Sequence, residues 1–184
     1  NSGIDELKKN VDTLLIISND KLREIHGDLK LTEAFGRADD ILTIAARSIA
    51  EIITVTGYIN VDFADVQTVL KDSGVAIMGC AFAEGTDRAR LAAELVLDSP
   101  LLNDSNINGA RYILLNITSG KTEVTMDEIG EITDYIQEQA GLTADIIMGT
   151  GTDISLGDKI AVTVIATGFK TTSEIIAEKN KPVR

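Results

Sequence analysis

Segments of two hydrophobic periodicities alternate along the chain, and this alternation restricts the possible folds more than any other feature. Short apolar runs rich in β-branched residues predict strands, and longer segments with apolar residues at helical spacing predict helices. The predicted strands are 11–17, 74–83, 110–118, 144–148 and 159–167. The predicted helices are 31–57, a short one ending near residue 71, 87–98 and 125–141. Such alternation is typical of an α/β or α+β fold with a mixed sheet.

Local signals predict where several helices begin and end. Gly57 is expected to end the first long helix in the left-handed conformation. Thr86 is expected to cap the helix over 87–98, which Ser99-Pro100 should stop. Thr125 and Glu128 form a capping-box pattern at the start of the last helix.

The composition excludes several classes of function. The chain has 184 residues, a net charge of −12 and 44% hydrophobic residues, which fits a folded domain rather than a disordered acidic chain. No Lys/Arg cluster provides a footprint for nucleic acid. A single Cys80 and a single His26 exclude a disulfide framework, a Cys-based zinc site and most His-based triads. The sequence has no membrane-spanning run and no signal-peptide pattern, so we expect a cytoplasmic protein.

Two segments imitate phosphate-binding loops. Ser119-Gly-Lys-Thr122 follows a predicted strand and precedes a helix, but Leu115 stands where a P-loop needs a glycine, which argues against a P-loop kinase. Gly149-Thr-Gly-Thr152 lies between two predicted strands and has no helix after it to supply an N-terminal dipole. We interpret this second segment as a flexible strand-to-strand loop.

The segment Asn60-Val-Asp62-Phe-Ala-Asp65 places one amide and two carboxylates ahead of a short predicted helix. Asp62 is well placed to N-cap that helix, and Asp65 three residues later completes a capping-box pattern. Carboxylates also bind hard cations and orient water, so the loop is a candidate catalytic site. The two interpretations are compatible, because a cap fixes the side-chain geometry that a catalytic loop needs.

Collinear segments of the chain resemble the FtsZ family, the bacterial homologues of tubulin. They are 7–20, 33–40, 59–66, 99–102, 109–118 and 160–168. The resemblance extends to Phe169, and its most specific part is the loop from Asn60 to Asp65. It implies a long central helix that leads into a C-terminal domain with a mixed four-stranded sheet and packed helices. The implied divisions are a remnant of the GTP-binding domain (1–30), the central helix (31–57), the GTPase-activating domain (58–169) and the start of a linker (170–184).

The resemblance implies that Asn60, Asp62 and Asp65 are catalytic residues of a synergy loop. In the family this loop enters the nucleotide pocket of the neighbouring subunit, where the two carboxylates position water and a cation for attack on the γ-phosphate of GTP. The chemistry is suitable, because hydrolysis of GTP depends mainly on positioning and charge neutralisation.

The residues implied to contact the guanine base and ribose are Phe35, Asp39 and Asn19. The family's glycine-rich phosphate loop is not found in this sequence, and neither is its C-terminal peptide for division-ring partners. The chain therefore resembles a C-terminal fragment of a GTPase that uses GTP/GDP with Mg²⁺, self-assembles into filaments and works in the cytoplasm at the division site. Alone it is expected to be inactive and to bind no GTP.

The sequence departs from the family pattern at Thr56, where the family usually has proline, and at Tyr58, which is bulkier than the expected aliphatic residue. Without a complete first domain, the central helix is expected to expose the face through residues 41, 45, 49 and 52. We therefore expect either self-association or disorder in residues 1–30. The alternative hypothesis is a stand-alone α/β interaction or ligand-binding module in which Asp62 and Asp65 serve only as helix caps.

Overall fold

A computed structural model of the chain describes residues 2–15, 30–54, 57–99 and 107–169. Asn19, His26, Thr56, Pro100 and the predicted linker (170–184) lie outside the described residues. Phe35 lies in a described helix, but its side chain does not belong to the described part.

The five strands form one mixed sheet in the order β1-β2-β5-β3-β4. Strand β5 is antiparallel to both β2 and β3, whereas β3 is parallel to β4 and β1 is parallel to β2. The predicted four-stranded mixed sheet is β2-β5-β3-β4, and β1 extends it by one short strand. The strand bounds are Thr13–Leu15 for β1, Gly74–Ala83 for β2, Tyr112–Ser119 for β3, Asp145–Thr152 for β4 and Ile160–Thr167 for β5.

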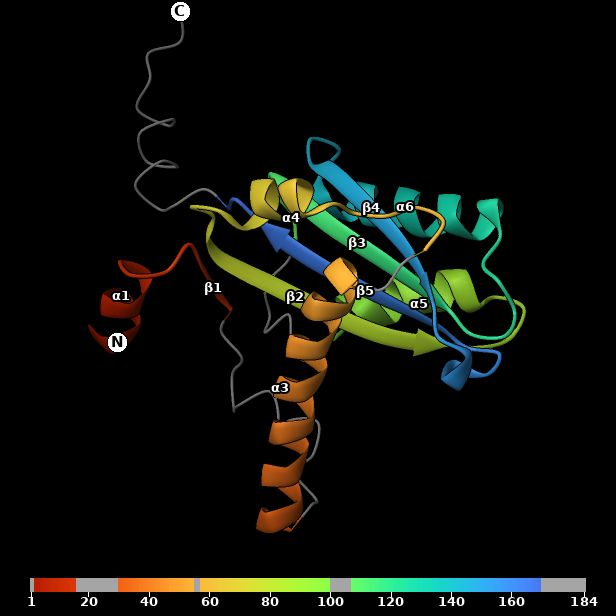
Figure 1. Cartoon of the computed structure of the whole chain (residues 1–184), viewed down its shortest axis with the longest axis horizontal. Helices are drawn as coiled ribbons and strands as arrows, with labels where there is room; N and C mark the ends of the chain where they lie inside the picture. The colour runs from red at the N-terminus through yellow and green to blue at the C-terminus, as the bar shows by residue number, and fades with distance from the viewer. Residues whose placement is uncertain (1, 16–29, 55–56, 100–106, 170–184) are drawn as a thin grey trace, which may run out of the picture.

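Helices cover both faces of the sheet, which gives the predicted α/β architecture (Figure 1). One face packs against α5 (Arg88–Leu97) and α6 (Met126–Ala140), and the other against α3 (Leu31–Thr54) and α4 (Phe63–Leu70). The remaining helices are α1 (Ser2–Lys8) and the 3₁₀ turn η2 (Ile154–Leu156).

Strand β3 illustrates why its residues form a central strand. Ile113, Leu115 and Ile117 alternate with Leu114, and all four are completely buried. The odd-numbered three belong to the core beneath α5 and α6, whereas Leu114 belongs to the core beneath α3 and α4. Because successive side chains of a strand point to opposite faces, this apolar run supplies both cores at once.

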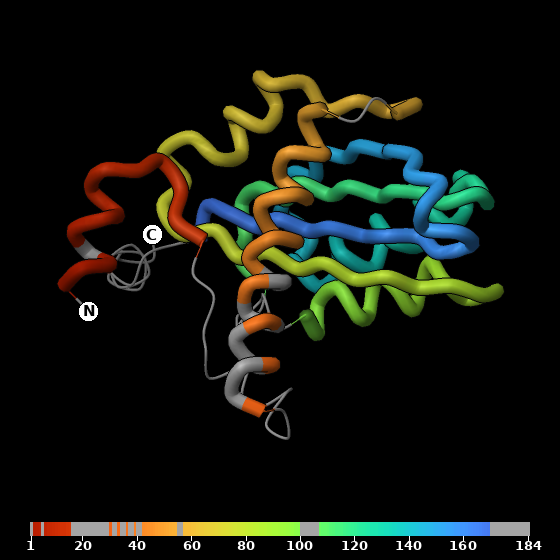
Figure 2. Tube along the Cα trace, turned by 60° about the horizontal axis from the view of Figure 1, so that its bottom comes forward, coloured from red at the N-terminus to blue at the C-terminus, as the bar shows by residue number. Residues whose placement is uncertain are grey.

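Among the side chains that the structure describes, those of α3 that pack against the sheet lie in its C-terminal half (Figure 2). Ala45, Ser48 and Ile52 are buried, and Ile49 is half-buried against the same core. The expectation that this face would be exposed is therefore wrong for residues 45, 49 and 52, because the chain's own sheet covers them. The side chain of Ile41 lies outside the described part of the chain. The N-terminal half of α3 extends beyond the sheet.

Two helix ends confirm or correct the sequence predictions. At α6, Thr125 and Glu128 form the predicted reciprocal capping box, and Gly141 ends the helix with φ = 93°. At α5 the N-cap is Asp87 rather than Thr86, and no side-chain hydrogen bond caps it. The first residue of α5, Arg88, is anchored by other elements, as described below.

Within the described residues, no helix is both long and apolar enough to cross a membrane.

Candidate functional site

The segment from Gly57 to Asp62 runs beside the edge strand β4. Thr150 N–H donates to the Ile59 carbonyl at 2.8 Å, and Ile59 N–H donates to the Thr150 hydroxyl oxygen at 3.0 Å. Since β4 is the last strand of the sheet, the first of these bonds uses a backbone N–H that an edge strand otherwise leaves unpaired.

Two glycines allow this close approach. A Cβ atom on Gly57 would lie 1.5 Å from the Thr150 carbonyl oxygen, and one on Gly149 would lie 2.7 Å from Cγ2 of Val61. Gly57 does not have a positive φ, so its predicted role as a left-handed cap is wrong. The predicted flexible loop over 149–152 is also wrong, because these residues belong to β4 and pair with β3.

The acidic residues of the loop stand at the start of α4. Asp62 is the N-cap residue, and its Oδ1 accepts a hydrogen bond from Asp65 N–H at 2.9 Å, which confirms the predicted cap. Asp65 therefore uses its backbone in this bond, while its half-exposed carboxylate lies in the first turn of the helix. Asn60 Oδ1 accepts a hydrogen bond from Gly57 N–H at 2.8 Å, so this amide braces the loop.

Apolar side chains surround the acidic loop on the surface. Tyr58 is 84% exposed, Phe63 65% and Met126 75%. A cavity of about 220 Å³ opens between the loop, the β3–α6 connection and the end of β4. Its lining residues are Tyr58, Ile59, Ser119, Glu123, Val124, Met126, Ile129, Thr150, Gly151 and Thr152.

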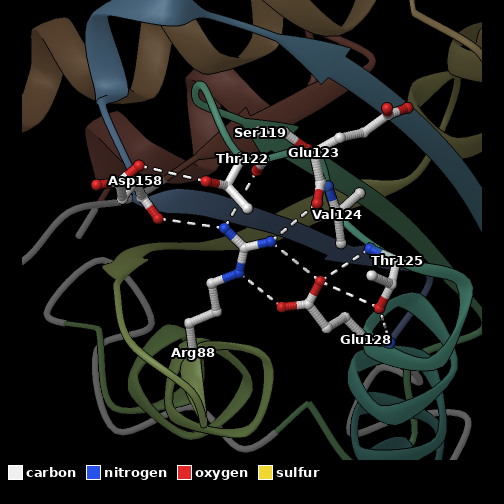
Figure 3. Close-up of polar contacts among 8 residues, drawn as sticks. All are labelled: Arg88, Ser119, Thr122, Glu123, Val124, Thr125, Glu128 and Asp158. Carbon is white, nitrogen blue, oxygen red and sulfur yellow. Dashed lines mark hydrogen bonds and ion pairs between the residues drawn. The ribbon is translucent and has the colours of Figure 1, made fainter.

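Arg88, a buried arginine that is 5% exposed, anchors the β3–α6 connection, which lines one side of this cavity (Figure 3). Its Nε and one terminal nitrogen donate to the two carboxylate oxygens of Glu128 at 2.6 and 3.0 Å. Its terminal nitrogens also donate to the carbonyl oxygens of Thr122, Glu123 and Asp158 at 3.0–3.2 Å. The guanidinium thus joins α5, the β3–α6 connection, the turn before β5 and the cap of α6.

The Arg88–Glu128 pair has shifted protonation equilibria. The bidentate hydrogen bond to Arg88 holds the pKa of Glu128 below its ordinary value of 4.5, against an opposing effect of burial, and the Thr125 backbone N–H lowers it further. The hydrogen bond to Glu128 raises the pKa of Arg88. Both groups stay charged at neutral pH, and the two charges compensate each other inside the fold.

The segment that imitates a P-loop is occupied by internal contacts. Gly120 N–H donates to the Lys159 carbonyl at 3.0 Å, and a Cβ on Gly120 would lie 2.0 Å from the Gly157 carbonyl oxygen. The Ser119 hydroxyl accepts from Val124 N–H at 2.9 Å. This geometry agrees with the sequence argument against a phosphate cradle.

The residues implied to contact the guanine base lie at the other end of α3. Asp39 is exposed, and Phe35 is one helical turn before it. The fifteen residues between Asp39 and the end of the helix at Thr54 correspond to roughly 22 Å of rise. One chain therefore brings Asn60, Asp62 and Asp65 together but does not bring them to Phe35 and Asp39.

Two other predicted features can be located. Cys80 is half-buried in β2, where Thr163 Oγ1 lies 3.7 Å from its sulfur, and burial raises the pKa of this thiol. It is a packing residue, as predicted. Across the described part of the chain, no group of three or more His, Cys, Asp or Glu side chains could hold a metal ion.

Sequence reasoning missed Arg88 and Thr150. Arg88 falls on the same helical face as the buried Ala92 and Val96, and an arginine in that register indicates a buried partner. The Gly-Thr-Gly pattern around Thr150 is a signal too, since glycine inside a strand often marks the close approach of another backbone.

Comparison with known proteins places the chain among relatives of one family. Residues 74–170 match the family model described as FtsZ family, C-terminal domain. Cell division protein FtsZ of Wigglesworthia glossinidia brevipalpis is 44% identical over 168 residues, and that of Pseudomonas aeruginosa is 43% identical over 183 residues. These alignments cover 91% and 99% of this chain but only 44% and 45% of those proteins. The chain thus spans less than half the length of these relatives.

Solved structures show the same similarity. An empty FtsZ dimer from M. jannaschii matches with a TM-score of 0.83 and 36% identity, covering 91% of this chain and 48% of that chain. Protofilaments of TubZ in the GDP form, from Bacillus thuringiensis serovar israelensis, match with a TM-score of 0.71 over 96% of this chain and 49% of that chain. The TubZ identity is 13%, so that match shows a shared fold alone.

Proposed function

The chain belongs to the FtsZ family and carries its C-terminal domain, and we propose that it forms part of a self-assembling GTPase of the bacterial division ring. In this proposal the loop from Gly57 to Asp65 completes the GTPase site of a neighbouring subunit, where GTP is the substrate. The assembled protein acts in the cytoplasm at the division site. Its partners are further copies of itself, and other division-ring proteins bind a C-terminal peptide.

The observation that carries the proposal is an acidic loop fixed at both ends. Thr150 holds the loop at Ile59, and the Asp62 cap holds it where α4 begins. Asn60 and Asp62 nevertheless remain exposed, and Asp65 is half-exposed. A rigid group of polar side chains that faces outward is suited to act on a substrate held by another molecule.

The position of the implied base-contacting residues favours a site shared between two chains. Asp39 and Phe35 lie on the half of α3 that extends beyond the sheet, whereas the acidic loop lies past the opposite end of that helix. In a head-to-tail assembly, the loop of one chain would meet the nucleotide held by the next chain. Head-to-tail contacts that do not close on themselves generate filaments.

The chemistry assigned to the loop is hydrolysis of GTP to GDP and phosphate. Asp65 would accept a hydrogen bond from the attacking water and orient it toward the γ-phosphate, because its carboxylate is not committed to the helix cap. Asp62 would hold Asp65 in place through the cap, and Asn60 would brace the loop through Gly57. A Mg²⁺ ion bound with the neighbour's nucleotide would neutralise phosphate charge, and carboxylate oxygens are ligands that it prefers.

The apolar surroundings of the loop support its placement at a contact between subunits. Tyr58, Phe63 and Met126 are each more than half exposed, yet all three lie beside the loop or its cavity. Exposed aromatic and methionine side chains are typical of the core of a protein interface. Burying them against a second subunit would also exclude water from the acidic residues.

The proposal is tested by Asp65→Asn in a full-length relative whose corresponding segment is replaced by this chain. Asparagine keeps the size of the side chain but removes the charge, so GTP turnover should fall strongly while GTP still binds. Asp134→Asn, an exposed substitution on α6, is the matched control and should leave turnover unchanged. Near-normal turnover of Asp65→Asn would refute the catalytic role and leave the loop as a helix cap in an interaction module.

A further inference from the structure

We propose that Thr150 is a positioning residue for the acidic loop, because its side chain and its backbone together set the register in which the loop lies against β4. The catalytic consequence of this inference rests on the proposed function. Thr150 is only 8% exposed, and it lies in the edge strand far along the sequence from the loop that it contacts.

Thr150 satisfies both backbone polar groups of Ile59. Its N–H donates to the Ile59 carbonyl at 2.8 Å, and its hydroxyl oxygen accepts from Ile59 N–H at 3.0 Å. A strand neighbour usually supplies a carbonyl for the second bond, and here a side-chain hydroxyl takes that place. Valine has nearly the same shape as threonine but no acceptor, so it would leave the Ile59 N–H without this partner.

Contacts at alternate residues fix the face that the loop presents. Gly57, the backbone of Ile59 and the side chain of Val61 lie against β4 at Thr150 and Gly149, whereas the side chains of Asn60 and Asp62 are exposed. This is the period of two of an extended segment beside a strand. A slip by one residue would turn the outward side chains toward the strand and the inward ones toward solvent.

The neighbouring glycines also restrict where the segment can lie, because a Cβ atom on either one would clash. Gly57 permits contact with the Thr150 carbonyl, and Gly149 leaves space for the side chain of Val61. Neither glycine offers a side-chain hydrogen bond. The Thr150 hydroxyl is therefore the side-chain group that recognises residue 59, and together with Thr150 N–H it sets the position of the loop that carries Asp62 and Asp65.

The test compares Thr150→Val with Thr150→Ser, which restores the hydroxyl, in the same full-length chimaera. Thr163→Val is the matched control, because Thr163 is 5% exposed in β5 and its hydroxyl contacts Cys80 rather than the loop. GTP turnover is measured per assembled subunit, together with GTP affinity and melting temperature. Hydrogen exchange of the Ile59 amide is measured by NMR in this chain.

We expect Thr150→Val to lower turnover by about tenfold or more, because small displacements of a catalytic group reduce rates steeply. GTP affinity should not change, and the Ile59 amide should exchange faster while the amides of β3 keep their protection. Thr150→Ser should recover most of the turnover. Thr163→Val should keep normal turnover even where its melting temperature falls as far as that of Thr150→Val.

Normal turnover of Thr150→Val would overturn the inference. Equal losses in Thr150→Val and Thr150→Ser would overturn it too, because the hydroxyl would then be irrelevant. A loss in Thr163→Val that matches the loss in Thr150→Val would replace positioning by general destabilisation. Asp65→Asn separates the two proposals. If Asp65→Asn loses turnover while Thr150→Val keeps it, only the inference about Thr150 fails. If Asp65→Asn keeps turnover, the proposed function fails, and the catalytic consequence of positioning by Thr150 fails with it.

Discussion

Replacing Arg88 by methionine should destabilise the fold by removing one member of a buried ion pair. Methionine retains much of the side-chain length but none of the five donors. Loss of one partner from a buried pair costs about 3–5 kcal/mol, mainly because the remaining charge is left uncompensated. The side chain of Glu128 is still 19% exposed, and Thr125 N–H continues to bond it.

The lower end of that range, about 3 kcal/mol, is therefore the expected loss in the free energy of unfolding. For a domain of this size, a loss of about 3 kcal/mol corresponds to a fall in melting temperature of roughly 6–12 °C. The assay is thermal and urea unfolding of the chain, followed by circular dichroism.

Arg90→Met provides the matched control for this experiment. Arg90 lies two residues further along α5, and its ion pair with Glu94 at 3.0 Å is solvent-exposed. Exposed pairs contribute little, so this variant should melt close to the wild type. Adding Glu128→Gln to Arg88→Met should recover part of the loss, because the uncompensated charge is then gone. A loss in Arg88→Met no larger than that in Arg90→Met would refute the reasoning.

Two further predictions concern pH and glycine contacts. Because the pKa of Glu128 is lower in the folded chain than its ordinary value of 4.5, its ionised form stabilises the fold fully above about that pH and loses this effect as the pH falls through the folded-state pKa. Glu128→Gln should therefore have a lower free energy of unfolding than the wild type at neutral pH. Unfolding measured from pH 7 to pH 3 should show this difference becoming smaller. A difference that stays constant over this range would contradict a lowered pKa of Glu128. Gly149→Ala should be destabilising and should speed exchange of the Ile59 amide, because its Cβ would lie 2.7 Å from the Val61 side chain. Gly130→Ala, in the middle of α6 with no atom near the new Cβ, should instead stabilise by about 0.5–1 kcal/mol, and opposite signs would contradict the packing argument.

Features that depend on local sequence were predictable. The Thr125–Glu128 capping box, the Asp62 cap and the strand over 74–83 form as expected, because each depends on residues a few positions apart. The apolar run of β3 predicted a buried strand for the same reason.

Features that depend on contacts between distant segments were not predictable from one sequence. Gly57 has the residue type of a left-handed cap, but its actual constraint is the backbone at Thr150, far away in the sequence. The glycines of 149–152 suggested a loop for the same reason, although they make room for a segment beside the strand. Arg88 gathers partners from three separate segments outside its own helix, and no local pattern specifies that set.

The acidic loop also combines a feature that local sequence predicts with one that depends on distant contacts. Its sequence predicted a cap and a candidate catalytic site, and the structure contains the hydrogen bond of the cap. The catalytic role of Asp65 depends on a second chain and therefore remains a prediction.

The central claim, that Asp65 acts in the site of a neighbouring subunit, is tested most directly by complementation. A full-length relative that carries the Asp→Asn substitution at its own counterpart of Asp65 binds GTP but should turn it over slowly. Adding this chain should raise GTP turnover in proportion to its concentration, because its intact loop is supplied to the neighbour's site. Adding the Asp65→Asn chain should give no increase. Equal turnover with both chains, or no increase with either, would contradict the account.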